Sequence, residues 1–186
     1  MREKALCAGK SFLRLLQSPL VVSGLEAIGN YHLNTKMLKP LIPSEHPLLH
    51  KKIKKCSDDL DRSKLSYTLT ENMFHYNGVG LSANQIGIEE RVFVMMIDIE
   101  SEETITCFNP RIIKESKDEV VMEEGCLSYP ELYLEIPRPS TIVVKYEDEG
   151  KEIHKRKLTG FIARIFQHEY DHMEGIDFTE RVSYNT

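Results

Sequence analysis

Two histidines near the end of the sequence have the spacing of metal ligands on a helix. His168 and His172 are four residues apart, so on an α-helix their imidazoles project from one face and can bind a single cation. Glu169 follows the first histidine, where a carboxylate can act as acid or base on a water molecule that the metal activates. The same pattern also arises by chance on surface helices, with both histidines in solvent. Other residues must therefore support a metal site.

The residues before this motif predict a helix with an apolar side. Apolar residues recur there at helical spacing, at Phe161, Ile162, Ile165 and Phe166. Thr159 suits the N-cap, and Gly175 suits the position just past the C-terminus. We expect this helix to be a core element that carries the metal ligands.

A catalytic zinc or iron site needs a third protein ligand and an open position. One subclass of zinc proteases has a third histidine downstream, but Phe178 stands at that position here. The third ligand should therefore come from upstream, and Cys126 is the best candidate because a thiolate binds zinc or ferrous iron strongly. Gly125 beside it lets the backbone approach a metal or a substrate closely. The alternative for Cys126 is a buried free thiol.

A glycine-containing stretch at residues 78–85 supplies a third motif. It reads G-V-G-L-S-A-N-Q and lacks the third glycine and the preceding strand of a dinucleotide-binding loop. In chain order, G-V-G-L-S-A-N-Q, E-G-C-L-S and Q-H-E-Y-D-H resemble the three motifs of the peptide deformylases, within a resemblance that spans residues 38–181. Many bacterial members continue into a C-terminal helix that docks on the ribosome, whereas this sequence ends at Thr186, soon after the third motif. In this it resembles the short members encoded by some bacteriophages, and we expect catalysis without the docking helix.

The resemblance implies an enzyme that removes the formyl group from N-formylmethionine at the start of newly made chains. It implies that Cys126, His168 and His172 bind one divalent metal ion, with Fe²⁺ usual in the family and Zn²⁺ or Ni²⁺ as substitutes. Glu169 is then the general acid/base, while the Gln85 side chain and the Leu127 backbone N–H polarise the formyl oxygen. Each such donor contributes about 3 kcal/mol in comparable sites.

The expected substrate contacts also follow from the resemblance. An apolar pocket for the methionine side chain is expected from Val79, Phe161 and Ile165, and the substrate-binding residues as a set are expected to be Val79, Gly80, Gly125, Phe161 and Ile165. Ser82 replaces a more usual alanine, a change that we expect to be tolerated. Glu124 and Arg138 either pair in support of the site or form a solvated pair.

Length and composition indicate one ordinary globular domain. The chain has 186 residues and a formal net charge of −5, enough for one core and without a basic stripe that would indicate nucleic acid. Its four cysteines show no C-x-x-C spacing, which favours a reducing compartment, and no apolar run is long enough for a membrane span. We expect a cytoplasmic monomer that acts on N-formylmethionyl peptides, with at most transient ribosome contact.

Residues 1–36 are expected to be an N-terminal extension, followed by one catalytic domain over residues 37–186. The segment is mildly basic, with Arg2, Lys4, Lys10 and Arg14, and it contains serines, so an organelle transit peptide is the alternative. Glu3 weakens that alternative. A signal peptide would need a longer unbroken apolar core.

The remaining pattern predicts an α+β fold, with antiparallel β-sheets around a central helix that carries the histidines. A first core helix is expected over residues 58–76, capped by Ser57 or Asp58 and stopped at Asn77-Gly78. Strands are expected at residues 92–97, 105–108, 120–122, 141–146 and 152–157, with turns at Asn109-Pro110 and Glu149-Gly150. Strands followed by a helix, without βα alternation, indicate antiparallel sheet.

Two other functions fit parts of the pattern. A metallopeptidase that cuts internal bonds uses the same histidine motif, but the missing downstream ligand disfavours it. A catalytically inactive metal-binding relative is disfavoured because every expected chemical group is present.

Overall fold

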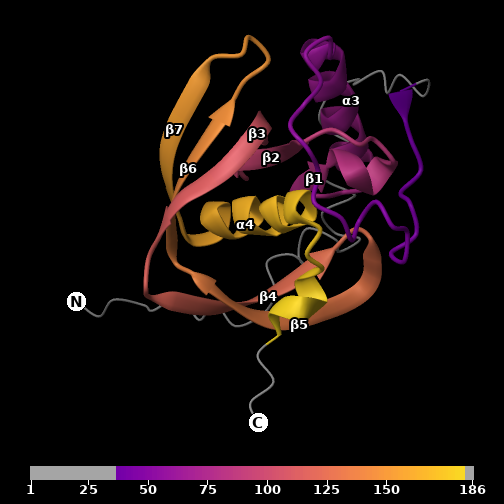
Figure 1. The fold of residues 1–186 in the computed structure, drawn as a ribbon. Helices are drawn as coiled ribbons and strands as arrows, with labels where there is room; N and C mark the ends of the chain where they lie inside the picture. Colours follow the sequence, from indigo (N-terminus) through magenta and orange to yellow (C-terminus); the bar gives the residue numbers. More distant parts are fainter. Residues whose placement is uncertain (1–36, 183–186) are drawn as a thin grey trace. The chain divides into compact units, whose positions relative to one another are not determined.

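The computed structural model describes residues 37–182, and the expected N-terminal extension lies outside the described residues. Over the described part the chain forms two antiparallel β-sheets and two α-helices, so the predicted α+β class is confirmed (Figure 1). None of the helices among these residues combines the length and the apolar character that a membrane crossing requires.

The larger sheet has five strands. Helix α4 (Gly160–Glu174) packs on one face of it, and helix α3 (Arg62–His75) packs on the other face at β1 and β2. Its order is β1-β2-β3-β6-β7, with every neighbouring pair antiparallel. Alternate side chains of β2 point to opposite faces, so Phe93 and Met95 pack with helix α4 while Val92 and Val94 pack with helix α3. The strands are β1 (Gly80–Ser82), β2 (Val92–Asp98), β3 (Glu103–Glu115), β6 (Thr141–Glu147) and β7 (Ile153–Thr159).

The smaller sheet is a hairpin of β4 (Glu119–Cys126) and β5 (Tyr129–Pro139). Figure 1 shows this curved hairpin across α4 from the larger sheet. A small apolar cluster of Cys126, Ile136 and Phe178 connects it to the segment after α4. Helix α4 therefore lies between two sheets, which explains why few of its side chains reach solvent.

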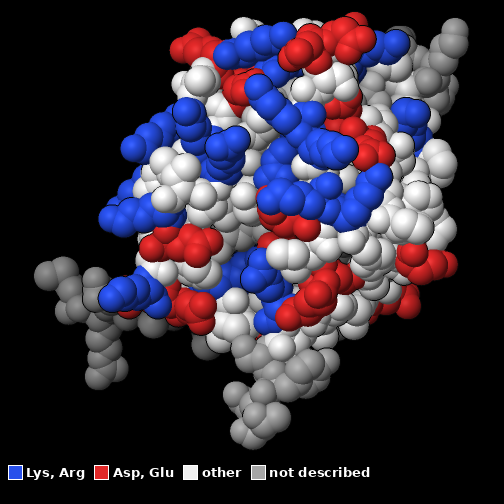
Figure 2. Space-filling model, in the orientation of Figure 1, with Lys and Arg blue, Asp and Glu red and all other residues white. Residues whose placement is uncertain are grey.

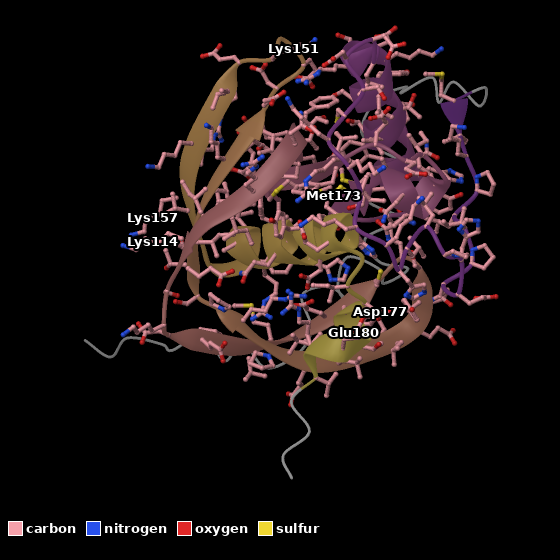
Figure 3. The ribbon with its side chains drawn as sticks, in the orientation of Figure 1. Lys114, Lys151, Lys157, Met173, Asp177 and Glu180 are labelled. Atoms are coloured by element: carbon pink, nitrogen blue, oxygen red, sulfur yellow. The ribbon has the colours of Figure 1, made fainter. Side chains whose placement is uncertain are left out.

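Helix α4 (Gly160–Glu174) carries both histidines and has the predicted end. Gly175 takes the left-handed conformation there, with φ 72°, as expected for the residue after a helix. Thr159 occupies the N-cap position, but its side chain makes no capping hydrogen bond, contrary to the expectation. After α4 a short 3₁₀ turn, η3 (Phe178–Arg181), is capped by Asp177, which accepts a hydrogen bond from the backbone N–H of Thr179 at 2.8 Å. Figure 3 labels Asp177 and Glu180 on this turn, beside β5.

Helix α3 (Arg62–His75) begins later than the sequence predicts. Asp61, rather than Ser57 or Asp58, is the N-cap, since its side chain accepts a hydrogen bond from the backbone N–H of Lys64 at 3.0 Å. The chain then leaves the helix near Asn77, whose φ is 54°, in agreement with the predicted stop. The 3₁₀ turn η2 (Ala83–Ile86) carries the end of the glycine-containing motif.

The predicted strands are present, but β3 and β4 extend well beyond the residues predicted for them, and one predicted turn was wrong. Asn109-Pro110 is not a turn between elements: it lies inside β3, where the register shifts between Phe108 and Arg111 and Asn109 takes φ 50°. The bulge accommodates the proline without ending the strand. Strands β1 and β5 were not predicted, because one is three residues long and the other contains three prolines.

Candidate metal centre

Cys126, His168 and His172 come together where the end of β4 meets the C-terminal half of α4. Their ligand atoms all lie within 4.8 Å of one another, and Cys126 Sγ is 3.3 Å from His172 Nε2. The register of the β4–β5 hairpin shifts between Gly125 and Cys126, directly before the residue that carries the sulfur. One sulfur and two imidazole nitrogens suit Zn²⁺ or Fe²⁺, and three ligands leave a coordination position open. The residues present therefore fit a catalytic metal ion.

Glu124 fixes the orientation of His168. Its Oε2 is 3.1 Å from His168 Nδ1. Burial raises the pKa of Glu124, but hydrogen bonds with His168 and Arg138 outweigh burial and hold its pKa far below the ordinary value. An ionised carboxylate can only accept, so Nδ1 donates the hydrogen bond and Nε2 is the nitrogen that remains for a metal. Burial also lowers the pKa of His168, but its contacts with Cys126 and Glu124 raise that pKa well above the ordinary value, so a metal ion would have to displace a proton from Nε2.

Glu124 is the centre of a buried network of charges. Its Oε1 accepts hydrogen bonds from Arg138 Nε at 2.6 Å and from Arg164 Nη1 at 2.7 Å. Arg138 reaches on to Asp171 Oδ2 at 2.7 Å. The side chains of Glu124 and Arg138 are 4% and 5% exposed. The pair is therefore buried, and the alternative that it lies in solvent was wrong. Two arginines and one histidine thus compensate a carboxylate that could not stay ionised alone.

His172 is positioned through its backbone. Its carbonyl oxygen accepts a hydrogen bond from Asn84 Nδ2 at 2.8 Å, which ties α4 to η2. Burial lowers the pKa of His172 well below its ordinary value, and repulsion from His168 and Arg138 lowers it further. His172 is therefore a neutral imidazole, the form that binds metals.

Glu169 is buried beside the ligands and held from two sides. Its Oε2 accepts a hydrogen bond from Ser82 Oγ at 2.7 Å, and Gly80 lies against its Oε1. Burial raises the pKa of Glu169 to about 6, opposed by the attraction of His168 and by the Ser82 hydrogen bond. A carboxyl group with a pKa near neutrality can both take and return a proton at physiological pH.

Gln85 directs its amide nitrogen toward the ligands. The backbone N–H of Ser82 donates to Gln85 Oε1 at 2.9 Å, and because that group can only donate, the amide orientation is fixed. Gln85 Nε2 then donates to Ser128 Oγ at 3.1 Å and faces Cys126 Sγ at 3.6 Å. The buried Gln85 amide therefore lies next to Cys126, with its N–H groups facing Cys126 and Ser128.

The three residues expected to form the apolar pocket share one cluster. Ile165 is a buried member of the core around α4, and Val79 and Phe161 pack against it while remaining partly exposed. Leu127, directly after the cysteine, and Val79 both pack against the neighbouring cluster around α3. Gly125 lies in β4 opposite Tyr133. Val79 and Phe161 therefore stay partly open to solvent, as residues that contact an apolar side chain of a substrate would be.

Sequence reasoning missed several supporting residues. Ser128, which accepts the Gln85 hydrogen bond, and Asn84, which holds α4, both lie inside the quoted motifs but have no chemical pattern of their own. Phe178, noted only as a missing ligand, packs its ring 5.7 Å from the ring of His168. Asp171 accepts from Arg138 and from Arg181, which no spacing rule would have linked.

Comparison with known proteins gives a consistent result. The sequence model described as polypeptide deformylase matches residues 38–186. The peptide deformylase of Thermotoga maritima is 40% identical over 138 residues, 74% of this chain and 82% of that protein. Its crystal structure gives a TM-score of 0.74 at 37% identity, covering 78% of this chain and 98% of that one.

Two further solved structures have the same fold. A probable peptide deformylase from Synechococcus phage S-SSM7 is 33% identical with a TM-score of 0.72, covering 77% of this chain and 99% of that one. The class I type b enzyme of Acinetobacter baumannii, solved with Met-Ala-Ser bound, is 30% identical with a TM-score of 0.70, covering 78% and 98%. The family match over four-fifths of the sequence and the shared fold establish that the chain belongs to the peptide deformylase family, whose members remove N-terminal formyl groups in a metal-dependent reaction.

Proposed function

We propose that this chain hydrolyses the formyl group of N-formylmethionyl peptides, with Cys126, His168 and His172 as metal ligands and Glu169 as general acid/base. The observation that carries the proposal is the approach of the three ligand atoms within 4.8 Å of one another, with the buried Glu169 carboxylate next along α4. When bound, the metal ion supplies a positive charge that acidifies water and polarises the formyl group.

Glu169 moves the proton in this mechanism. Its carboxylate takes a proton from the attacking water as the new C–O bond forms at the formyl carbon. When the C–N bond breaks, the same carboxyl group gives that proton to the leaving amine, so formate and a free methionine amino group are released. Ser82 and Gly80 hold the carboxylate in one place during both transfers.

Gln85 and the backbone N–H of Leu127 stabilise the developing charge on the formyl oxygen. The Gln85 amide is pre-oriented by Ser82, so little reorganisation is needed when the oxygen becomes negative. Its present acceptor, Ser128, can exchange for the substrate oxygen. Each donor is expected to lower the barrier by about 3 kcal/mol.

The substrate is held through its methionine side chain, which is apolar, and through the backbone at its amino-terminal end. Val79, Phe161 and Ile165 are proposed to contact the methionine side chain, and Gly80 and Gly125 to let the peptide backbone approach the metal. The Met-Ala-Ser complex of the Acinetobacter relative supports a peptide that begins with methionine.

We further propose Fe²⁺ as the native metal, with Zn²⁺ or Ni²⁺ as substitutes, and the cytoplasm as the compartment. A thiolate with two imidazoles suits a soft or borderline ion such as ferrous iron. The described cysteines, Cys56, Cys107 and Cys126, are all free thiols, in keeping with a reducing environment. A monomeric state and at most transient ribosome contact stay predictions.

The test is formate release from formyl-Met-Ala by protein purified without oxygen, with its metal content measured on the same sample. Activity is expected in the unchanged protein and a loss of about 100-fold or more in Glu169→Ala. Equal formate release by Glu169→Ala would overturn the mechanism. Cleavage of internal bonds in a longer peptide with a blocked amino terminus, without formate release, would instead indicate a metallopeptidase.

A further inference from the structure

The face of the larger sheet that is turned away from α4 carries basic residues in register across three strands. Arg111, Lys145 and Lys155 are direct neighbours on β3, β6 and β7. In the next row that points to the same face, Lys114 and Lys157 lie on either side of Val143. We call these five residues the basic face: Arg111, Lys114, Lys145, Lys155 and Lys157.

The alternation along β6 and β7 places the basic face opposite the core. Ile142, Val144 and Leu158 point into the apolar cluster around α4. Lys145 follows Val144 on β6 and Lys157 precedes Leu158 on β7, so both lysines point to the opposite face. Figure 3 labels Lys114 and Lys157 close together on the side of these strands away from α4. In Figure 2 blue atoms gather over the same edge of the molecule.

The positive charges of the basic face are exposed and uncompensated. All five side chains are exposed, and within residues 37–182 none of them takes part in an ion pair. Like charges placed directly opposite on neighbouring strands destabilise a sheet. The arrangement occurs in a chain whose net charge is −5, so it is not the by-product of a basic composition. A polyanionic partner would remove the repulsion.

The dimensions favour a narrow polyanion over a broad one. Neighbouring strands are about 4.8 Å apart, so the row of Arg111, Lys145 and Lys155 spans about 10 Å. A nucleic-acid backbone can lie along such a row while the acidic remainder of the protein stays away from it. An anionic bilayer is a broad surface, so it would also come close to the acidic residues around the basic face, and like charges would repel it.

We propose that the basic face binds the phosphate backbone of RNA without reading its sequence. Lysine and arginine contact phosphate oxygens, whereas sequence reading requires contacts with base edges or aromatic rings for stacking. The apolar neighbours on this face are aliphatic, such as Val143, Ile113 and Ile153, and offer no stacking surface. The absence of a basic stripe in the sequence is explained by the fold, because the five cations are spread from residue 111 to residue 157 and come together only in the sheet.

The test compares two double variants of the full chain that remove the same charge. In Lys145→Gln/Lys155→Gln two members of the basic face are neutralised, and in Lys39→Gln/Lys54→Gln two exposed lysines outside it are neutralised. Binding of a fluorescent RNA hairpin of arbitrary sequence is followed by anisotropy over a series of salt concentrations. The unchanged protein should show a log–log salt slope of about −3 to −5 if all five residues contact phosphate.

In the basic-face variant the magnitude of this salt slope should be smaller by about two, and in the control variant the slope should be unchanged. Formate release from a free formylated peptide should be the same in all three proteins, and the melting temperature of the basic-face variant should not fall, since a like-charge pair has been removed. No RNA binding by the unchanged protein, or equal weakening in both variants, would overturn the proposal. The proposal would also be overturned if the protein bound vesicles that contain anionic lipid through Lys145 and Lys155 and did not bind RNA.

Discussion

Gly80 and Glu169 touch so closely that no further atom fits between them: a Cβ on Gly80 would lie 2.5 Å from Glu169 Oε1. The other carboxylate oxygen accepts the hydrogen bond from Ser82 at 2.7 Å. Both contacts come from the three-residue strand β1, which pairs with β2 and packs against α4. The place of the proposed acid/base is therefore set by a strand of the larger sheet and not by α4 alone.

Gly80→Ala is expected to lower kcat for formate release by about 100-fold or more, because the added methyl group displaces the carboxylate that transfers the proton. The metal content should match that of the unchanged protein, since the three atoms nearest to the added methyl group all belong to Glu169 and not to a proposed ligand. Steady-state formate release and metal analysis check both expectations. Gly150→Ala is the control, because its Cβ would meet only the flexible side chain of Asp148, at 3.3 Å. Full activity in Gly80→Ala would contradict the assigned position of Glu169.

Gly175→Ala is expected to destabilise the fold by more than the backbone strain alone. Gly175 has φ 72°, and a Cβ there would overlap the backbone of Lys51. Gly160 at the other end of α4 also has a positive φ, 57°, but has open space around its Cβ. Gly160→Ala should therefore cost about 1–2 kcal/mol, the strain of the left-handed region. Urea unfolding should show a larger loss in Gly175→Ala; equal losses would mean that the Lys51 segment simply moves away.

The parts of the site that follow from spacing along one helix could be predicted from the sequence. His168 and His172 share a face of α4 because of the helical repeat, and Gly175 ends that helix as its conformational freedom predicts. Cys126 could be proposed only by the chemistry of a third ligand and by resemblance, since it lies 42 positions before His168, with strands β5, β6 and β7 between them.

The supporting contacts could not be predicted, because they depend on tertiary packing. Nothing in the sequence links Glu124 to Arg164, or to Asp171 through Arg138, since Glu124 lies on β4, Arg138 on β5, and Arg164 and Asp171 on α4. The same reason explains the turn wrongly expected at Asn109-Pro110. Local propensity favours a turn there, but pairing of β3 with β2 on one side and β6 on the other keeps the strand continuous through a bulge.

Glu147 is expected to make stability depend on pH in acid. Burial raises the pKa of Glu147, but hydrogen bonds from Arg62 and Asn109 outweigh burial and hold its pKa below the ordinary value. When folding lowers the pKa of a carboxyl group, the ionised group stabilises the folded protein at every pH above the pKa that the group has in the unfolded chain. That stabilisation is lost as the pH falls to the pKa of the group in the folded protein. The difference in unfolding free energy between the unchanged protein and Glu147→Gln should therefore be constant at neutral pH and shrink below about pH 4.

Urea unfolding at a series of pH values measures this difference. Glu135→Gln is the matched control, because Glu135 is exposed on β5 and makes no ion pair among the described residues. A difference that stays constant into acid would show that the Arg62 contact does not depend on the charge of Glu147.

Glu124→Gln is expected to weaken both metal binding and the fold, because one neutral amide cannot replace a carboxylate that accepts from Arg138, Arg164 and His168 together. The unpaired buried arginines should lower the unfolding free energy by about 3–5 kcal/mol. Loss of the acceptor for His168 Nδ1 should weaken metal affinity by about 10- to 100-fold, measured by chelator competition on folded protein at low temperature. Glu135→Gln should change neither quantity. If the Gln variant lost stability but held the metal as tightly as before, Glu124 would support the sheet and not the orientation of the ligand.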